Sequence, residues 1–411
     1  MKTILHADLN SFYASVEIMQ HPELKHKPVA VCGATETRHG IILAKSQLAK
    51  EAGIKTAMTN AEAKRLCPDL IMVPPHYDEY LKYSQLTRQI YERYTDLVEP
   101  FGMDECWLDV THSRMYGSGR KIAEEIRQTV KSELGLTVSI GISFTKIFSK
   151  LGSDMKKPDA ITELPPEAIS KIVYPLPVSD LLYVGPATAT KLCNYAGIST
   201  IGQLAHARPD MLKDLLGING IKLWEFANGI DNARVKHKDH IVPIKSIGRG
   251  ITCTGDLHTD EAVWKVMLAL AQDVGHKLRL QHVMATGVQI SLREKSLLTR
   301  QYQAQLSFPT QSPKYLAQAG KKLLIEKYPW VAPIRAVTIR AINLIPDTTP
   351  QQLDLFTDFK KVDKQEKAEA TVEAIRRRFG KHAIMPACLM GDLKMPDDGR
   401  DEVILPGMLY I

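Results

Sequence analysis

The pattern of apolar residues changes character near residue 170, and this change divides the chain. Before it, strand-like and helix-like runs alternate, as in "ILHADL", "SFYASVEIMQ" and "KPVAVCG". After it come short helical stretches joined by glycine-containing turns, for example "LLGINGIKL". From about residue 246 strands return, in "ATGVQISLR" and "IRAVTIRAINL". Because 411 residues are too many for one core, we expect an α/β domain, an all-helical domain and a second α/β domain.

Positive charge is concentrated in the second α/β segment. Residues 234–345 contain 17 Lys or Arg against 7 Asp or Glu, an excess of 10, whereas the whole chain carries +7. The remainder is therefore slightly acidic. A basic module on a nearly neutral body predicts a polyanion along that module, although a solvated basic surface would give the same counts.

The composition argues against a membrane or secreted protein. No apolar run approaches the roughly 20 residues that span a bilayer, and "MKTILHADLN" lacks the apolar core of a signal peptide. The six cysteines are scattered and form no Cys-x-x-Cys pair, which argues against a zinc site and for reduced thiols. We expect a cytoplasmic monomer.

The run "FGMDECWLDV", residues 101–110, places adjacent carboxylates in an apolar strand. Asp104 and Glu105 raise each other's pKa unless a cation or strong donors compensate. Asp8 stands near the end of another predicted strand, and carboxylates from several strand ends suit Mg²⁺. A pair of such ions can promote an in-line phosphoryl displacement. We therefore predict a magnesium site, with an exposed acidic turn as the alternative, and expect Asp109 to cap or pair structurally.

Other side chains near these strands suit a nucleotide. Lys157 shares the segment "FTKIFSKLGSDMKKP" with three further lysines, which act as point charges on phosphate. A solvated helix face would have the same pattern. Phe12 and Tyr13 follow the strand that bears Asp8, where an aromatic ring could stack under a sugar and exclude a 2′-hydroxyl. Two core aromatics at a helix start are the alternative.

Two further motifs suggest macromolecular partners. The turns in "YVGPATATKL" and "LLGINGIKL" present backbone N–H groups that can hold nucleic-acid phosphates without reading sequence. Tight helical hairpins would look the same. The stretch "QLDLF", in a polar tail, is typical of a peptide ligand for a groove on a partner, unless its apolar residues fold back onto the body.

Taken in order, "DLNSFYASVE", "DECWLDVT", "SDMKKP", the glycine turns and the basic module resemble the Y-family translesion DNA polymerases, the DinB/UmuC group. The resemblance spans about residues 1–345, and "DLNSFYASVE" and "AIRRRFGKHAI" are most similar to Gram-positive UmuC-like and DNA polymerase IV members. It implies an α/β multi-domain right-hand polymerase. The implied parts are an α/β palm (1–10 and 77–166), small fingers (11–76), an all-helical thumb with helix-hairpin-helix-like turns (167–232), a linker (233–243), a basic α/β little finger (244–345) and a tail (346–411) with a clamp-binding motif at 352–356.

The resemblance also implies roles for matching positions. The catalytic and metal-binding residues would be Asp8, Asp104 and Glu105, with the carbonyl of Leu9, around two Mg²⁺ ions. The incoming dNTP would meet Phe12, Tyr13, Lys50 and Lys157, with Tyr13 as the steric gate against ribonucleotides. Primer-template DNA would contact Gly185, Gly217, Gly220, Lys245 and Arg249. The sliding clamp would bind Gln352, Leu353, Asp354, Leu355 and Phe356.

Three positions depart from the family pattern. Gln47 and Lys50 stand where many members have a Tyr-x-x-Arg pair, and a lysine cannot supply the forked hydrogen bonding of an arginine. Tyr183 stands at a usual glycine in the first thumb turn. Thr145 replaces an asparagine before Lys146.

The function implied is DNA-dependent DNA polymerisation from dNTPs, with bypass of damaged template bases in an SOS-type repair response. The sequence shows no second acidic cluster of the kind that a proofreading exonuclease needs, so low fidelity is expected. Two alternatives remain. A nucleotidyl cyclase would need neither the thumb turns nor the basic module. A non-catalytic accessory protein that binds DNA and the clamp would not require Asp8, Glu105 and Lys157 together.

Overall fold

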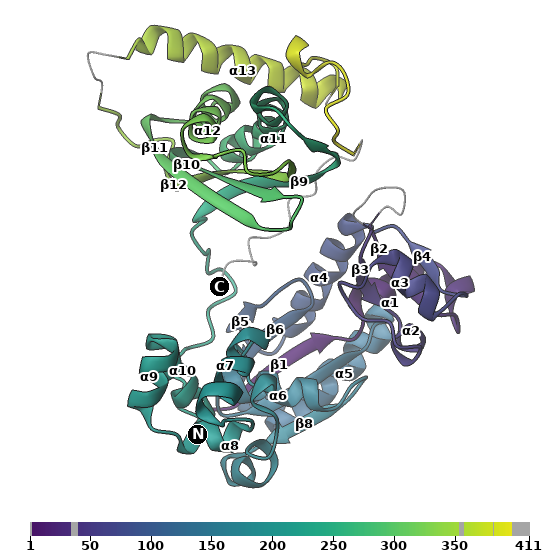
Figure 1. Cartoon of the computed structure of the whole chain (residues 1–411). Helices are drawn as coiled ribbons and strands as arrows, with labels where there is room; N and C mark the ends of the chain where they lie inside the picture. Colours follow the sequence, from purple (N-terminus) through teal and green to yellow (C-terminus); the bar gives the residue numbers. More distant parts are fainter. Residues whose placement is uncertain (1, 34–39, 353–356, 381, 397–411) are drawn as a thin grey trace. The chain divides into compact units, whose positions relative to one another are not determined.

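The computed structural model describes residues 2–33, 40–352, 357–380 and 382–396 (Figure 1). It divides into two compact units, and the boundary between Ile241 and Val242 falls within the predicted linker. Palm, fingers and thumb segments thus group into one unit. In the part of the chain that the structure describes, no helix is long and apolar enough to cross a membrane.

The first unit is built on a five-stranded sheet in the order β5-β6-β1-β7-β8. The central strand β1 pairs antiparallel with β6 and β7. All six residues of β1 are buried, because both faces of the sheet are covered. The strands are β1 (Ile4–Leu9), β5 (Val98–Pro100), β6 (Glu105–Asp109), β7 (Val138–Ser143) and β8 (Ile161–Leu164).

The two faces of β1 serve different purposes. Leu5, Ala7 and Leu9 share an apolar core with α4 (Tyr77–Tyr91) and α5 (Gly119–Leu134). The alternate residues His6 and Asp8 face α6 (Lys146–Met155), which supplies their polar partners. The period of two along a strand therefore places every polar side chain of β1 beneath one helix.

Two glycines let α6 lie directly on the sheet. A Cβ on Gly141 in β7 would stand 1.9 Å from the Ser149 carbonyl oxygen, and one on Gly152 would stand 3.2 Å from the Gly141 Cα. The other side of α6 buries Phe148 and Leu151 in the core of the helical segment that follows. The helix is therefore held between the sheet and that segment.

The segment predicted as fingers forms a small α/β layer around a three-stranded sheet, ordered β3-β2-β4. Ile42, Ile54 and Leu70 are fully buried in its core. Thr59 and Glu62 form a reciprocal cap at the start of α3. The elements are α1 (Phe12–Gln20), β2 (Val29–Cys32), β3 (Ile42–Lys45), α2 (Gln47–Glu51), α3 (Asn60–Leu66) and β4 (Ile71–Val73).

The segment predicted as the thumb contains α7 (Pro186–Ala196), α8 (Ile201–His206), α9 (Pro209–Leu216) and α10 (Ile218–Ala227). The chain after α10 stays in contact with the first unit as far as Lys238. Val235 is buried against Trp107 and Ile4, the backbone N–H of Lys236 donates to Glu99 at 3.0 Å, and that of Lys238 donates to the Asp96 carbonyl at 2.9 Å. Half of the predicted linker is thus fixed to the sheet domain.

The second unit is a four-stranded antiparallel sheet, ordered β11-β10-β12-β9, with α11 (Asp260–Leu280) and α12 (Pro313–Lys327) side by side on one face (Figure 1). The opposite face carries Ile342 beside small and polar residues that include Gly248, Gln289, Arg293, Thr338 and Arg340. The strands are β9 (Ser246–Leu257), β10 (Val283–Glu294), β11 (Thr299–Thr310) and β12 (Ile334–Pro346).

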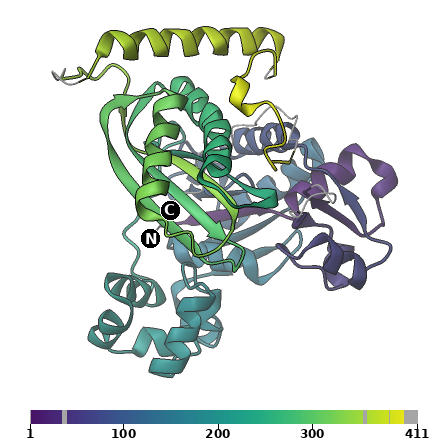
Figure 2. The ribbon, with the colours of Figure 1, turned by 45° about the horizontal axis from the view of Figure 1, so that its top comes forward.

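The tail contains the helix α13 (Phe359–Phe379), which begins after Asp358, whose side chain accepts the backbone N–H of Lys361 at 3.1 Å. Figure 2 shows it crossing the outer side of α11 and α12. No residue of α13 is buried. Its polar contacts pair Glu373 with His276 at 2.6 Å and with Arg279, and Glu369 with Ser312 at 2.9 Å, and the Phe359 ring meets that of Phe308 with centroids 6.2 Å apart.

Candidate active site

The structure brings together the three acids predicted from the sequence. Asp8 on β1 and Glu105 on β6 are direct partners across the strand pair. Asp104 comes immediately before β6, and its carbonyl accepts the backbone N–H of Leu9 at 3.0 Å. Asp8 is almost fully buried, whereas Asp104 and Glu105 are half-buried. The carboxylates therefore gather at one end of the two central strands.

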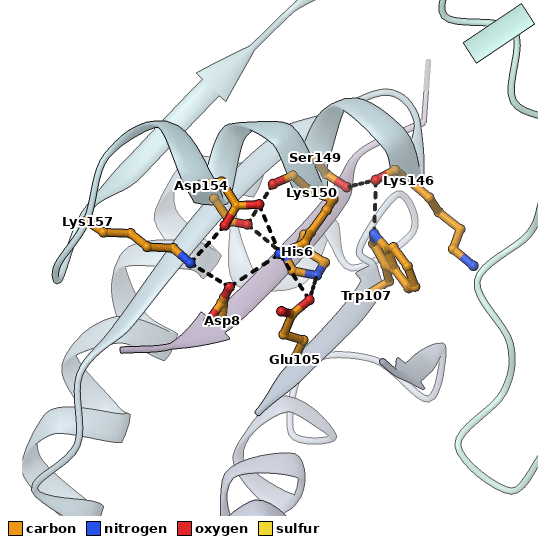
Figure 3. A network of polar contacts seen from close by, with 10 residues as sticks. His6, Asp8, Glu105, Trp107, Lys146, Ser149, Lys150, Asp154 and Lys157 are labelled. Atoms are coloured by element: carbon orange, nitrogen blue, oxygen red, sulfur yellow. Dashed lines mark hydrogen bonds and ion pairs between the residues drawn. The ribbon is translucent and has the colours of Figure 1, made fainter. Parts of the chain in front are cut away.

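The helix α6 and the residues just after it supply positive charge to this end of the sheet (Figure 3). The Lys157 ammonium lies 2.7 Å from Asp8 Oδ2. The Lys150 ammonium lies 3.1 Å from Glu105 Oε2 and 3.4 Å from Asp8 Oδ2. Asp154 contacts both lysines, at 3.0 and 2.8 Å. Sequence analysis had assigned only Lys157 to the site; Lys150 and Asp154 are additions from the structure.

The pKa of Asp104 indicates how far this positive charge reaches. Burial, reinforced by the charges of Asp8 and Glu105, raises the pKa of Asp104 to about 7. Burial would also raise the pKa of Glu105, but its hydrogen bond with His6 and the charge of Lys150 hold that pKa below its ordinary value. The Asp104 end of the site is thus short of positive charge.

The donor set fits a hard divalent cation. Three carboxylates with a shortage of positive charge beside Asp104 are the ligands that Mg²⁺ accepts, together with water and phosphate. Among the described residues, no three His, Cys, Asp or Glu side chains already stand in a metal-binding arrangement. The ammonium groups of Lys150 and Lys157 engage the oxygens of Asp8 and Glu105 here, so a metal would take the place of these ammonium groups.

Tyr13, the predicted steric gate, is held rigidly beside the acids. Its ring stacks on Tyr80 with centroids 4.2 Å apart and planes 8° apart. Its hydroxyl donates to the Met103 sulfur at 3.4 Å, next to Asp104 in the chain. Burial raises the pKa of Tyr13 to about 12, so the phenol is neutral. The neighbouring Phe12 side chain is only 3% exposed, so any contact of this residue with a nucleotide would use its backbone.

Lys50 lies exposed on α2, and the structure adds Lys45 beside it. Burial, reinforced by the charge of Lys50, lowers the pKa of Lys45. The Lys45 ammonium donates to the Thr56 hydroxyl at 3.0 Å. Two neighbouring ammonium groups favour an anion.

The glycine turns differ from one another. Gly185 precedes α7, and Gly217, with a φ of 67°, joins α9 to α10; both have open space where a side chain would lie. Gly220 lies inside α10, its N–H donates to the Gly217 carbonyl, and a Cβ there would be 2.1 Å from the Leu212 carbonyl oxygen. Gly220 therefore allows α9 and α10 to approach, and its contact with DNA stays a prediction.

The basic residues of the second unit lie in different settings, and their contacts with DNA stay predictions. Lys245 is exposed just before β9. Arg249 lies on the face of β9 that carries Ile247 and Ile251, and its Nε is 3.8 Å from Asp273 of α11. The predicted DNA contact of Arg249 is thus on the covered side of the sheet. Arg293 and Arg340 lie on the open face instead.

Two remaining expectations concern Asp109 and the tail. Asp109 accepts the backbone N–H of Thr111 at 3.0 Å, which confirms its structural role. Gln352 is exposed, and Leu353, Asp354, Leu355 and Phe356 lie outside the described residues.

Comparison with known proteins agrees with this geometry. Residues 7–154 match the model of the impB/mucB/samB family, and residues 244–355 match that of its C-terminal domain. DNA polymerase IV of Acetivibrio thermocellus is 45% identical over 95% of this chain and 98% of its own length. This chain belongs to the Y-family of DNA polymerases. DNA polymerase IV 1 of Bacillus subtilis is 37% identical over 92% of this Y-family chain and 91% of its own length.

A solved structure shares the fold. The Y-family DNA polymerase chimera Dbh-Dpo4(243-245)-Dbh matches with a TM-score of 0.73, covering 84% of this chain and 99% of its own, at 21% identity. The predicted family and the mixed α/β right-hand fold are thereby confirmed for this Y-family polymerase, whereas the domain bounds stay predictions.

Proposed function

We propose that this Y-family polymerase extends a primer on template DNA, past damaged template bases as well as intact ones, with Asp8, Asp104 and Glu105 as its metal ligands. Its DNA polymerase IV relatives support DNA-directed polymerase activity. The observation that carries the residue assignment is the direct pairing of Asp8 with Glu105 across β1 and β6, with Asp104 one residue away. Neither a cyclase nor an accessory protein is favoured, because the two DNA polymerase IV relatives align with almost the whole chain.

Polymerases of this family generally depend on metal ions, and the carboxylates here suit two Mg²⁺ ions. When bound, such ions supply electrostatic stabilisation to the attacking and leaving oxygens of a phosphoryl transfer. Asp8, Asp104 and Glu105 would hold them, with the Leu9 carbonyl as a further ligand. The protein's own contribution is to fix these oxygens before substrate arrives.

The remaining polar groups of the site suit a dNTP. Lys157 is charged and about 29% exposed, and Asp154 holds its ammonium at 2.8 Å, so it can turn from Asp8 to a phosphate. Lys45 and Lys50 would attract the same triphosphate from the fingers. Tyr13 cannot yield to a 2′-hydroxyl, because Tyr80 backs its ring. The site would therefore select deoxyribonucleotides.

DNA would be held through its backbone by both units. The amides of the Gly185 and Gly217 turns and the open sheet face with Arg293 and Arg340 suit phosphates, so binding should depend on salt and little on sequence. Residues 352–356 would bind a sliding clamp. We place this monomeric enzyme in the cytoplasm, in an SOS-type response, and without a proofreading exonuclease.

Primer extension tests the function. Wild type, Glu105→Gln and the matched control Asp109→Asn are compared with Mg²⁺ and dNTPs on intact and lesion-containing templates. Glu105→Gln should lose about 10²-fold or more in rate while DNA affinity persists, whereas Asp109→Asn, which alters an acid of the same strand away from the site, should stay near wild type. Extension by Glu105→Gln at the wild-type rate would reject the metal assignment. Arrest of wild type at every lesion would reject translesion activity.

A further inference from the structure

His6 is a fully buried side chain that the proposed reaction does not use. It lies on β1, two residues before Asp8, and its ring meets Trp107 edge-on with centroids 5.2 Å apart. Its Nδ1 is 2.8 Å from the Ser153 hydroxyl oxygen, and its Nε2 lies at an ion-pair distance of 3.2 Å from Glu105 Oε2, without full hydrogen-bond geometry (Figure 3). A buried imidazole needs a polar partner at each nitrogen. Here one partner is a hydroxyl of α6 and the other is a carboxylate of the candidate metal site.

The charge on Glu105 decides which nitrogen carries the hydrogen. The Lys150 ammonium is 3.1 Å from the same Oε2 atom, so this carboxylate is ionised and can only accept. An Nε2 lone pair at 3.2 Å from it would be repelled, so the favoured tautomer carries its hydrogen on Nε2. Nδ1 is then an acceptor and takes the hydrogen of the Ser153 hydroxyl. That hydroxyl also stands 2.8 Å from the Lys150 carbonyl, its alternative acceptor.

We propose that His6 is a positioning residue for Glu105: its Nε2–H fixes where the carboxylate stands, and Ser153 selects the tautomer that can do so. The inference rests on the proposed function, because it takes Glu105 as a metal ligand. Lys150, the other partner of Glu105, is a long side chain shared with Asp8 and Asp154. His6 is a ring packed within the sheet, so it defines the position more rigidly. Loss of this donor should weaken metal binding before any substrate is present.

Binding of Mn²⁺ to the full chain without DNA or dNTP gives the first test, read from the electron paramagnetic resonance signal of free Mn²⁺. His6→Leu should weaken binding by about 10- to 100-fold. His6→Gln should recover most of the loss, because its amide can donate to Glu105. In a Glu105→Gln background, His6→Leu should add little. Ile4→Val serves as the control, because it removes one methylene from the same buried strand face.

Steady-state primer extension adds a second readout. His6→Leu should lower kcat at limiting metal, with the KM for dNTP unchanged, and excess metal should restore kcat. Equal impairment of His6→Leu and His6→Gln would mean that His6 only fills space, which would overturn the inference. So would wild-type Mn²⁺ affinity in a folded His6→Leu variant. If His6→Leu does not fold, Ser153→Ala takes its place, with a smaller loss of affinity expected.

Nitrogen-15 spectra of the histidine rings provide a third test that needs no metal. The resonances lost in His6→Gln identify His6 in wild type, and they should show the hydrogen on Nε2. A hydrogen on Nδ1 would contradict the mechanism. Because the Mn²⁺ and ring-nitrogen tests need no polymerisation, a wild type that failed to extend primers would reject the proposed function while these two tests still judged His6.

Discussion

The close approach of α6 to the sheet makes Gly141 a sensitive position, and Gly141→Ala tests whether that approach is needed. The added Cβ would stand 1.9 Å from the Ser149 carbonyl oxygen and 2.4 Å from the Ser153 backbone nitrogen. Carbon atoms need about 3.5–4.0 Å to sit comfortably against other heavy atoms. Both obstacles are helix backbone, which cannot rotate away as a side chain can. The helix must therefore retreat by roughly 1 Å or more.

Gly141→Ala should lower both the stability of the fold and the rate of the reaction. Overpacking of this kind typically costs about 1–3 kcal/mol of the free energy of unfolding. Retreat of α6 also carries Lys150 away from Glu105 and Asp8, contacts that are now 3.1 and 3.4 Å. Misplacement of reacting groups by about 1 Å can reduce a rate about 10²-fold. We expect Gly141→Ala to lose activity far beyond its loss of stability.

The assay is primer extension under single-turnover conditions, beside urea unfolding. Gly255→Ala is the control, because its Cβ would meet only the movable Lys394 side chain at 3.2 Å. Gly152→Ala should be intermediate, since its nearest neighbour would be 3.2 Å away. Wild-type activity and stability in Gly141→Ala would refute the reasoning, because α6 would then not need its present distance from the sheet.

Three further predictions concern the site. The pKa of Asp104 is about 7 in the folded chain, above its ordinary 3.8, so the folded state binds more protons and the free energy of unfolding falls as pH rises between about 4 and 7. Asp104→Asn should remove up to about 4 kcal/mol of that loss, measured by metal-free urea unfolding at pH 8. An unchanged dependence of stability on pH in this variant would contradict the prediction. Tyr13→Ala should raise ribonucleotide incorporation roughly 10- to 100-fold, measured as the ratio of kcat/KM values for rNTP and dNTP, and no change would exclude a steric gate. Lys157→Ala should raise the dNTP KM by about 10-fold or more with DNA affinity unchanged, whereas an effect on DNA affinity alone would argue against a phosphate contact.

The acidic residues of the site could be predicted from the sequence because each sits at a strand end where its neighbours are apolar. Asp8 and Glu105 prove to be paired residues of adjacent strands, a register that a single chain does not reveal. His6 lies on the same strand face as Asp8, and this period of two was visible in advance. Its partners were not, because Ser153 comes from α6 and Glu105 from β6, both far along the chain.

The spacing of charged residues in and just after α6 contains a further signal. Lys150 and Asp154, four residues apart, lie on one face of α6, and Asp154 contacts both Lys150 and Lys157, which follows the helix. Arg249 could have been placed in the same way, because it shares its strand face with Ile247 and Ile251. Gly220 could not, since a glycine needed for helix packing and one needed at a turn look alike in sequence.

The anchoring of Val235, Lys236 and Lys238 to the sheet domain has a consequence for how tightly the enzyme holds DNA. It leaves residues 239–245 as the free tether to the second unit, which can extend to about 25 Å at most. A tether of this length keeps the second unit at an effective concentration in the millimolar range beside DNA bound to the first. The enzyme is then a bivalent ligand whose avidity depends on tether length. Asp96→Ala, which removes the carboxylate that holds the Lys238 ammonium at 2.9 Å, weakens the last of these anchors and should lengthen the tether and speed the enzyme's departure from its template.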